Sequence, residues 1–315
     1  MSLTLLALML EAAFGYPPPL LARVGHPVIW IGAAIDALDK ALNHGPPLTR
    51  RLRGALALAL LLAPCFTIGF WLQRALLALP FGVVPLALLA STLLAQRGLH
   101  EHVANVLHAL EKSLDEGRAA VGKIVGRDVT KLDEAGVARA AIESLAENFS
   151  DGIVAPALWL AVFGLPGALC YKAINTADSM IGHKNKKYQD FGFAAARLDD
   201  LVNLPASRLS AALLIAAAAT QKRASASEAA RIVSRDARTH ASPNAGWPEA
   251  AMAGALDLKL GGERAYGDRV VAGATLGDGR SGATPDDMRR ALNLYRAAAA
   301  GLWLLAGVGW VFWGA

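Results

Sequence analysis

The chain has 315 residues, of which 54% are hydrophobic and only 18% are charged. Soluble domains carry about 25% charged residues, so this composition excludes an ordinary soluble protein and favours a polytopic membrane protein with sizeable polar loops. The net charge of +5 is spread over those loops, as in the lysine- and arginine-rich cytoplasmic loops of membrane proteins. No compact basic segment with interleaved aromatic residues is present, which argues against nucleic-acid binding.

The first forty residues predict two helices that do not span a bilayer. Residues 3–14 are apolar but too short for a span, and the prolines from residue 17 onwards stop a helix. Residues 26–43 have apolar side chains at helical spacing. We expect this amphipathic helix to lie along the membrane surface, with Asp39 turned away from its apolar stripe.

The next region predicts a pair of membrane helices. Residues 55–72 and 75–95 are uncharged and long enough to span a bilayer, and Arg74 interrupts the apolar sequence between them. Arginines precede the first run and follow the second. The pattern therefore indicates a tight helical hairpin with both ends on the cytoplasmic side.

The central region combines polar helices with a broken apolar run. Residues 99–148 are polar and helical in pattern, and residues 152–171 are apolar but contain the helix-breaking sequence Gly164-Leu165-Pro166-Gly167. We expect two half-helices, either a re-entrant hairpin or a broken span. Irregular backbone at membrane depth is tolerated only inside protein or along a wet cavity.

The C-terminal part adds a helix at residues 199–221 and an uncharged terminal span at residues 297–315. No segment alternates as a strand does. The predicted fold is therefore all-α: a polytopic integral membrane protein with re-entrant or broken helices. We expect one integrated domain, 1–315, in which the helical cytoplasmic loops lie at about 97–150, 172–203 and 222–296.

Carboxylate and amide side chains gather in three stretches at the borders of the apolar runs. Membranes penalise such groups, so we interpret them as functional. Their oxygens are the ligands that a hard cation such as Mg²⁺ prefers. In chain order the clusters are Glu143, Glu147, Asn148 and Asp151; Asn175 and Asp178; and Asp199, Asp200 and Asn203.

Each cluster also has a structural interpretation. Glu143 by itself fits a solvated helix face. Asp178 has Lys172 as an alternative partner. The two adjacent acids of the third cluster point in different directions on a helix, so one of them is expected to pair with Arg197 or Arg208.

A lysine-rich loop lies between the second and third clusters. It reads Lys184-Asn185-Lys186-Lys187-Tyr188. A basic run is usually a solvated loop. Because acid and amide clusters flank this one, it also fits a loop that neutralises phosphate oxygens.

The polar sequence from residue 125 onwards resembles the CobD/CbiB family. The matching strings cover roughly half of the chain in the family's order, and their polar residues would not recur by chance among hydrophobic proteins. They are VGRDVTKL, AAIESLAENFSDGIVAP, YKAINTADSM, YQDFGFAAARLDDLVNLPASRLS and SPNAGWPEAAMAGAL.

The resemblance implies a membrane-bound adenosylcobinamide-phosphate synthase of cobalamin biosynthesis. Such an enzyme joins a propionate carboxylate of the corrinoid adenosylcobyric acid to the amine of (R)-1-aminopropan-2-yl phosphate. ATP is the co-substrate, with Mg²⁺ and an acyl-phosphate intermediate expected. The resemblance also implies the bacterial cytoplasmic membrane, with the active site facing the cytoplasm. Homo-oligomers or contacts with other membrane enzymes of the pathway stay open.

We assign roles at the matching positions by charge type, and we expect Asn148, Asp178 and Asp200 to share one pocket. The residues assigned to catalysis are Glu147, Asp178, Asp200 and Glu249. Those assigned to Mg²⁺ are Glu143, Glu147, Asp151, Asp178, Asp199 and Asp200. Those assigned to ATP or substrate are Arg127, Asn148, Asn175, Lys184, Lys187, Tyr188, Arg197, Asn203, Arg208 and Asn244.

Two other functions stay open: a transporter, whose broken helix and acids would form an ion path, and a catalytically silent membrane sensor of the same family. The chain also departs from the family pattern. Tyr16 stands where an acid is expected. The loop that begins at Lys184 is rich in lysine where arginine is commoner, and lysine does not replace arginine in bidentate phosphate contacts.

Overall fold

The computed structural model describes residues 2–16, 23, 25–126, 128–262, 264–266, 269–271 and 273–313, and most of them are helical. The helices are α1 (Leu3–Phe14), α3 (Pro27–Leu42), α4 (Pro47–Leu77), α5 (Val83–Ser91), α6 (Gln96–Lys112), α7 (Leu114–Val121), α8 (Glu134–Phe149), α9 (Ala155–Ile181), α10 (Phe193–Val202), α11 (Leu204–Ala218), α12 (Ala226–Asp236), α13 (Gly246–Leu256) and α14 (Pro285–Trp313). A π-helical turn, η1 (Ser150–Val154), joins α8 to α9, and a 3₁₀ turn, η2 (Ala237–Thr239), follows α12.

Several helical segments are long and apolar enough to cross a membrane. Within the described residues there are four, at Pro47–Leu77, Val83–Lys112, Glu134–Ile181 and Pro285–Gly309. A fifth arises if α10 and α11, which are bent by 43° at a short break, count as one span. These segments confirm the predicted all-α, multi-pass membrane fold.

The chain divides into two compact units. Unit 1 comprises Met1–Ala95, Ala155–Asn203 and Ala306–Ala315, and unit 2 comprises Gln96–Val154 and Leu204–Leu305. Each unit draws on distant parts of the sequence. The prediction of one integrated domain stays a prediction.

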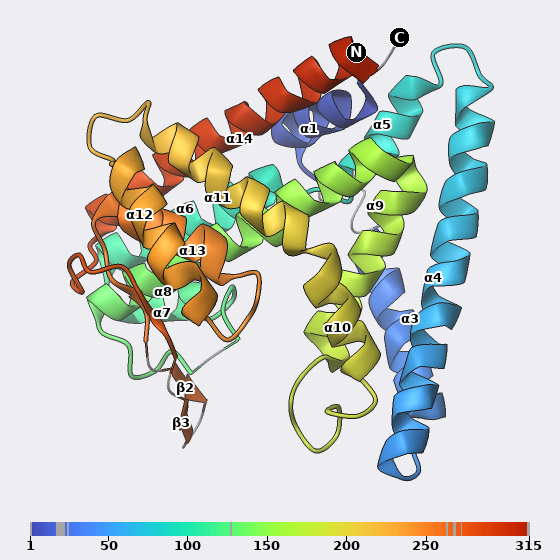
Figure 1. Ribbon diagram of the computed structural model, residues 1–315, viewed down its shortest axis with the longest axis horizontal. Coiled ribbons are helices and arrows are strands. Elements are labelled where there is room, and N and C mark those ends of the chain that lie inside the picture. The colour runs from blue at the N-terminus through green and yellow to red at the C-terminus, as the bar shows by residue number, and fades with distance from the viewer. Residues whose placement is uncertain are drawn as a thin grey trace. The chain divides into compact units, whose positions relative to one another are not determined.

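The core of unit 1 lies where α3, α4 and α9 pack together (Figure 1). Ile31 and Ile35 of α3 meet Ala57 and Leu61 of α4 there, against small buried side chains of α9. The apolar stripe predicted for α3 is thus confirmed. Small residues allow the helices to approach closely, which is how membrane helices gain packing contacts.

Asp39 differs from its prediction. Its side chain is buried rather than turned away. The amide of Asn43 donates to Oδ1 at 2.7 Å, and Lys187 Nζ lies 2.8 Å from Oδ2. A carboxylate can leave water when such partners satisfy it, and the helix pattern alone does not reveal a partner 148 residues away.

The predicted hairpin turn falls later than expected. The helix α4 continues through Arg74, which suits a helix C-terminus because its charge complements the helix dipole. The turn lies at residues 78–82. Gly82 is required there, because a Cβ at this position would come within 1.7 Å of the Leu76 carbonyl oxygen.

The break predicted in the central apolar run is present in α9. Gly164 has φ 69° and ψ −157°, a conformation that essentially only glycine adopts. The backbone N–H of Leu165, which the kink frees, donates to Gln73 Oε1 at 2.7 Å. A side chain of α4 therefore closes the break.

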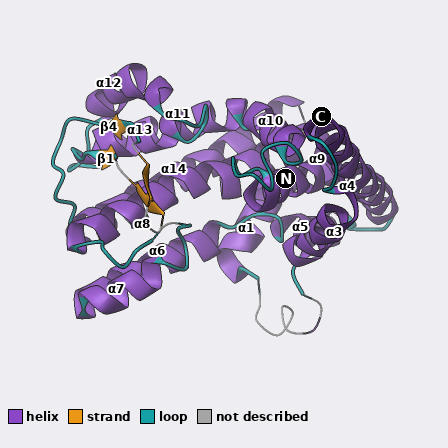
Figure 2. Ribbon diagram, turned by 90° about the horizontal axis from the view of Figure 1, so that it is seen from below, coloured by secondary structure: helices purple, strands orange, loops and turns teal. Residues whose placement is uncertain are grey.

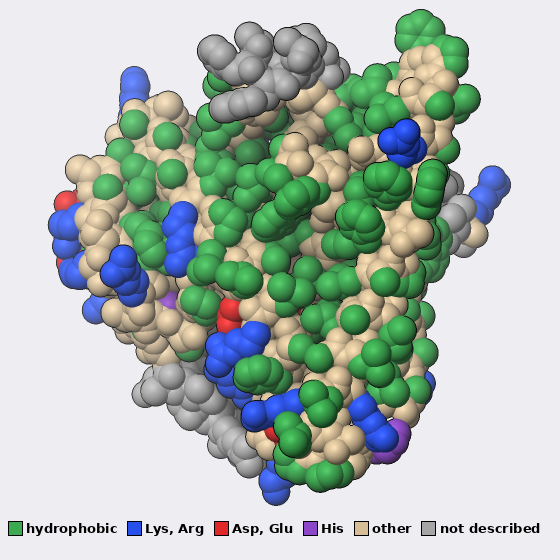
Figure 3. Space-filling view, turned by 45° about the vertical axis from the view of Figure 1, so that its right-hand side comes forward, with side chains coloured by type: hydrophobic (Ala, Val, Ile, Leu, Met, Phe, Trp, Pro, Cys, Tyr) green, Lys and Arg blue, Asp and Glu red, His purple; other side chains and the backbone are tan. Residues whose placement is uncertain are grey.

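Unit 1 exposes many large hydrophobic side chains along α4, including Leu60, Phe66, Ile68 and Trp71. Figure 3 turns the α4 side forward and shows hydrophobic side chains over much of that face. Lipid tails are as apolar as these side chains, so the exposure suits a bilayer.

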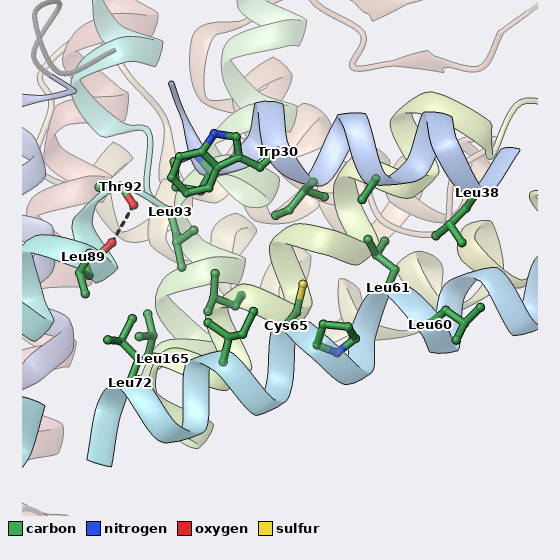
Figure 4. Close-up of a pocket in the computed structure, with 16 residues that line it drawn as sticks. Trp30, Leu38, Leu60, Leu61, Cys65, Leu72, Leu89, Thr92, Leu93 and Leu165 are labelled. Atoms are coloured by element: carbon green, nitrogen blue, oxygen red, sulfur yellow. Dashed lines mark hydrogen bonds between the residues drawn. The ribbon is translucent and has the colours of Figure 1, made fainter. Parts of the chain in front are cut away.

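An apolar cavity of about 350 Å³ lies among α3, α4, α5 and α9 (Figure 4). Trp30, Cys65, Leu93 and Leu165 belong to its lining. The hydroxyl of Thr92 is turned back to its own chain, where it donates to the Leu89 carbonyl at 2.7 Å. The cavity therefore suits an apolar occupant, and its described lining offers no groups for polar chemistry.

Unit 2 surrounds α13, which is buried along its whole length. It packs closely on α12, because a Cβ at Gly254 would come within 2.6 Å of the Glu228 carbonyl oxygen. Two short antiparallel pairs follow: β1 (Leu260–Gly261) with β4 (Thr275–Leu276), and β2 (Arg264–Tyr266) with β3 (Arg269–Val271).

Figure 2 shows β1 and β4 beside α13. The prediction that no segment forms a strand is therefore wrong for this stretch, where each strand is only two or three residues long. The terminal helix also begins earlier than predicted, at Pro285, because Asp286 and Asp287 suit the positive end of a helix.

Candidate functional site

The second and third predicted clusters come together in unit 1. Asn175 and Asp178 lie on the last two turns of α9, and Asp199, Asp200 and Asn203 lie at the end of α10, which packs against α9. The amide of Asn175 donates to Asp199 Oδ1 at 3.5 Å. Residues that are more than twenty positions apart thus form one acid and amide cluster.

A buried tyrosine is hydrogen-bonded to one member of this cluster. Tyr171 donates its hydroxyl to Asn203 Oδ1 at 2.9 Å, and both side chains are almost fully buried. The amide of Asn203 in turn donates to the Asp199 backbone carbonyl at 3.2 Å. Asn203 is therefore held by its neighbours, which orients the end of α10.

The three carboxylates of this cluster, Asp178, Asp199 and Asp200, lie close enough to repel one another. Asp178 interacts unfavourably with Asp199 and Asp200, and the latter two repel each other as well. Arg197 Nη1 lies 3.4 Å from Asp200 Oδ2, which confirms that one of the adjacent acids pairs with an arginine. The arginine of this pair is exposed, so it screens the mutual repulsion of the three carboxylates only weakly.

The donor chemistry of the unit 1 cluster suits a hard cation. No three His, Cys, Asp or Glu side chains among the described residues form a ready-made metal cage. Mg²⁺ usually needs only one or two carboxylates together with waters and phosphate oxygens. Asp178, Asp199 and the oxygen of Asn175 fit that requirement, and the Mg²⁺ assignment stays a prediction.

The lysine-rich loop makes an internal contact. Lys187 Nζ lies 2.8 Å from Asp39 Oδ2, and it also donates to the Tyr188 hydroxyl at 2.6 Å. Burial raises the pKa of Asp39, but the bonds from Lys187, Asn43 and Tyr188 outweigh it and hold that pKa below its ordinary value. The bonds to Asp39 and Tyr188 raise the pKa of Lys187. Lys187 and Tyr188 thus tie the loop to α3, whereas Lys184 is exposed.

A second polar cluster lies in unit 2, around Arg208 of α11. Its Nη1 donates to Asn244 Oδ1 at 2.9 Å and to Ser207 Oγ at 2.9 Å. Its guanidinium carbon lies 4.4 Å from the ring centroid of Trp247. Arg208 and Asn244, which the sequence assigned to substrate, are therefore in direct contact.

Glu249 is fully buried on the first turn of α13. Its Oε1 lies 4.0 Å from His240 Nε2, and the His240 side chain is also largely buried. At 4.0 Å the two groups are close but not hydrogen-bonded, and both are of types that act in general acid–base catalysis. The two residues precede and follow Asn244 in the same turn-rich segment.

The first predicted cluster lies on α8 and η1 of unit 2. Glu143 is buried, and its Oε1 accepts a hydrogen bond from the Gly261 backbone N–H at 2.8 Å, so its interpretation as a solvated face is wrong. Glu147 and Asn148 are exposed. Asp151 lies in η1, a π-helical turn of the kind often found at functional sites, which packs against α11.

Two parts of the predicted site stay predictions. Arg127 lies outside the described residues. Asn148 belongs to unit 2, whereas Asp178 and Asp200 belong to unit 1.

Sequence reasoning missed several residues that contact the predicted ones, among them Tyr171, Ser207, His240 and Trp247. Tyr171 was considered only as the end of the apolar run at residues 152–171. Trp247 lies inside the string SPNAGWPEAAMAGAL, which also holds two assigned residues. The position of Trp247 within this family string was the signal that could have identified it as a site residue.

The membrane-length helices, the break in α9 and the two polar clusters define a multi-pass membrane protein with polar functional groups beside its apolar helices. The chain belongs to the CobD/CbiB family, whose description is "CobD/Cbib protein" and whose pattern matches residues 4–295. This confirms the resemblance seen in the polar strings.

Curated relatives carry the name cobalamin biosynthesis protein CobD, and three of them illustrate the similarity. The protein of a Sinorhizobium species is 51% identical over 299 residues, which cover 93% of each chain. That of Rhodobacter capsulatus is 48% identical over 313 residues, which cover 99% of this chain and 98% of the relative. That of Sinorhizobium fredii is 49% identical over 301 residues, which cover 94% and 92%. No solved structure matches the chain.

Proposed function

We propose that this protein acts in cobalamin biosynthesis as an adenosylcobinamide-phosphate synthase. It would join a propionate carboxylate of adenosylcobyric acid to the amine of (R)-1-aminopropan-2-yl phosphate, at the expense of ATP. Support for the pathway comes from the family and from relatives named cobalamin biosynthesis protein CobD. The observation that carries the chemistry is the cluster of mutually repelling carboxylates in unit 1.

The reaction requires activation because a carboxylate is a poor electrophile. The γ-phosphoryl group of ATP passes to a carboxylate oxygen and ADP leaves. The amine nitrogen then attacks the acyl carbon. As the C–N bond forms, the C–O bond to the phosphoryl group breaks, phosphate leaves with the electron pair, and the amine loses a proton. Such chemistry depends on positioning and on charge neutralisation.

In unit 1, we assign Asp178, Asp199 and Asp200 to holding the cation that accompanies ATP. Bound Mg²⁺ would neutralise phosphate oxygens during transfer. The cluster suits this role because a bound cation would relieve its repulsion while keeping the carboxylates ionised. Asn175 orients Asp199, and Asn203 fixes the backbone beside it.

In unit 2, we assign Arg208 to a phosphate or carboxylate of a substrate. Its contacts to Asn244 and Ser207 all come from Nη1. Stacking on Trp247 fixes the plane of the guanidinium. The Nε and Nη2 groups of a fixed guanidinium suit bidentate binding of an oxyanion.

We assign Glu249 as the general base that accepts the proton lost by the amine. Its carboxylate is fully buried and has His240 beside it. A general base in such a setting accepts a proton more readily than a solvated carboxylate.

The break in α9 is the feature that would favour a transporter. In transporters, unwound backbone groups bind the transported ion. Here the freed N–H of Leu165 is bonded to Gln73, which supports a structural role for the break and favours the ligase.

The test is an assay of the purified protein in lipid nanodiscs with ATP, Mg²⁺, adenosylcobyric acid and aminopropanol phosphate. We expect adenosylcobinamide phosphate by mass spectrometry, and ADP release that requires both organic substrates. The Rhodobacter capsulatus relative, assayed in parallel, checks the conditions. If that relative forms product and this protein forms none, the proposal is wrong.

A further inference from the structure

A second, basic pocket lies in unit 2, away from every residue assigned above. It encloses about 430 Å³ between the segment Thr220–Ala224, which follows α11, and the first turns of α14. The volume lies within the range of small-ligand sites. Its charged lining residues are Lys222, Arg223, Asp286, Arg289 and Arg290.

The arginines of the pocket already have partners. Arg223 Nη2 lies 2.8 Å from Asp286 Oδ2, Arg289 pairs with Glu111, and Arg290 Nη1 lies 2.8 Å from Asp287 Oδ1. Three acids thus face the three arginines. Arg290 is largely buried and its pair holds the guanidinium in place, whereas Arg223 and Arg289 are exposed and their pairs hold them more loosely.

Positive charge nevertheless exceeds negative charge around the pocket. Asp287 is shared with a further arginine, Arg280, at 2.9 Å. Lys222 is exposed and, within the part of the chain that the structure describes, pairs with no carboxylate. The surplus favours an anionic occupant.

One donor in the pocket lacks an acceptor. Arg290 Nε is buried and, among the described residues, has no hydrogen-bond partner. Its Nη2 donates to the Arg223 carbonyl, which holds the guanidinium against the opposite wall. A buried donor without an acceptor costs about 1–3 kcal/mol. This nitrogen is closed off from the open volume of the pocket, so the contacts to an occupant would come from Lys222 and from the exposed guanidinium groups of Arg223 and Arg289.

The pocket lies where apolar helices begin and end. Its α14 residues precede the uncharged stretch of that helix, which starts at Ala297, and its other wall follows the apolar part of α11. The two helices approach each other at Gly301, where a Cβ would meet Leu213 at 3.2 Å. Arg290 is about 10 Å along the helix axis from Ala297, which is headgroup depth for a helix that enters a bilayer.

We propose that this pocket binds a phosphate-bearing anion at the membrane surface. Arginine prefers phosphate because its planar donors match two phosphate oxygens, and basic pockets at the ends of membrane helices suit anionic headgroups. A phospholipid headgroup and a soluble phosphate share this chemistry. The inference is independent of the ligase proposal.

The test compares two double variants in nanodiscs. Lys222→Gln/Arg223→Gln removes two charges from the pocket. Lys40→Gln/Lys259→Gln removes two charges from exposed positions elsewhere. The melting temperature is followed against the fraction of phosphatidylglycerol in phosphatidylcholine nanodiscs. In pure phosphatidylcholine, it is followed against inorganic phosphate, with chloride at matched ionic strength.

We expect at least one ligand to raise the melting temperature of the wild-type protein and of the control equally. The half-maximal concentration should be roughly tenfold higher in the pocket variant, as expected for the loss of a charged hydrogen bond. A response to phosphatidylglycerol alone assigns a lipid headgroup, and a response to phosphate assigns a soluble ligand. If the double variant fails to fold, Lys222→Gln alone replaces it, since this lysine has no ion pair to lose. No shift with either ligand, or an equal shift in pocket and control variants, would overturn the proposal.

Discussion

The two units handle their polar side chains in opposite ways. In unit 2, Arg208, Asn244 and Ser207 bond to one another. In unit 1, Asp178, Asp199 and Asp200 repel one another, and the arginine that pairs with Asp200 is exposed.

This difference indicates that the Arg208 cluster of unit 2 is complete in the folded protein, whereas the aspartate cluster of unit 1 needs a ligand to balance its charge. Mutual hydrogen bonds stabilise the folded state as they form, so the Arg208 cluster is a pre-arranged element. Repulsion among carboxylates destabilises the folded state until a cation arrives. Strained electrostatics of this kind concentrate at functional sites, so variants of the two clusters should separate activity from stability.

The largest effect is expected in unit 1. Asp178→Asn should lower turnover about 100-fold or more, as for the loss of a group that positions a metal. It should leave the melting temperature unchanged or raise it, because the variant removes a charge that repels Asp199 and Asp200. Product formation and thermal unfolding, both in nanodiscs, measure the two outcomes. Asp200→Asn should show the same pattern.

The matched control is Asp36→Asn, which changes an exposed aspartate of α3. It should keep wild-type turnover and wild-type stability. Wild-type turnover in both Asp178→Asn and Asp200→Asn would refute the site. A large fall in melting temperature would instead mark these aspartates as structural.

In unit 2 the expected effect is on stability as well as activity. Asn244→Ala removes the acceptor shared by Arg208 and Ser207, and should lower the free energy of unfolding by about 1–3 kcal/mol. Chemical denaturation in detergent measures the change. Asn105→Ala, at an exposed position of α6, should be close to neutral. If Asn244→Ala proves as stable as this control, the hydrogen bonds of the Arg208 cluster do not stabilise the folded state, and the proposed contrast with unit 1 is wrong.

Mg²⁺ should distinguish the clusters further. Relief of repulsion in unit 1 predicts that Mg²⁺ stabilises the wild-type protein without nucleotide, by about 1 kcal/mol at five times its Kd. Asn244→Ala should keep this stabilisation and Asp178→Asn should lose most of it. Melting curves with Mg²⁺ and after chelation provide the measurement. An equal response in both variants would place the cation elsewhere.

Much of the fold could be predicted because single positions decide it. The helix break follows from Gly164, and the amphipathic face of α3 follows from the spacing of Ile31 and Ile35. Helix ends were less predictable. The apolar pattern stops at Arg74, but a charge suits the last turn of a helix and does not end it.

The sequence predicted residues of the candidate site but not the contacts between them. Arg208 and Asn244 were assigned from the family strings, yet nothing local shows that they bond across 36 positions. The same holds for Glu143, whose partner is a backbone N–H on a short strand that no periodicity revealed. The long-range partners of buried polar groups depend on how the helices pack, and the local spacing of residues in the sequence does not determine that packing.

The smallest effect concerns Asp39, an acid of unit 1 whose partners in the folded protein satisfy its charge. Asp39 has its pKa lowered by its bonds in the folded state, so its contribution to stability is complete above its ordinary pKa of 3.8 and is lost as the pH falls through the lower folded value. Lys187 has a raised pKa, so its contribution is complete below 10.5 and is lost only as the pH rises through the higher folded value. Asp39→Asn should therefore melt slightly below the wild-type protein at neutral pH, and the gap should close as the pH falls below 3.8. Asp36→Asn should show no such pH-dependent gap. If the difference in melting temperature between Asp39→Asn and the wild-type protein persists unchanged in acid, Asp39 stabilises the loop through its shape and not through its charge. Asp39 would then no longer contrast with the aspartates that repel one another.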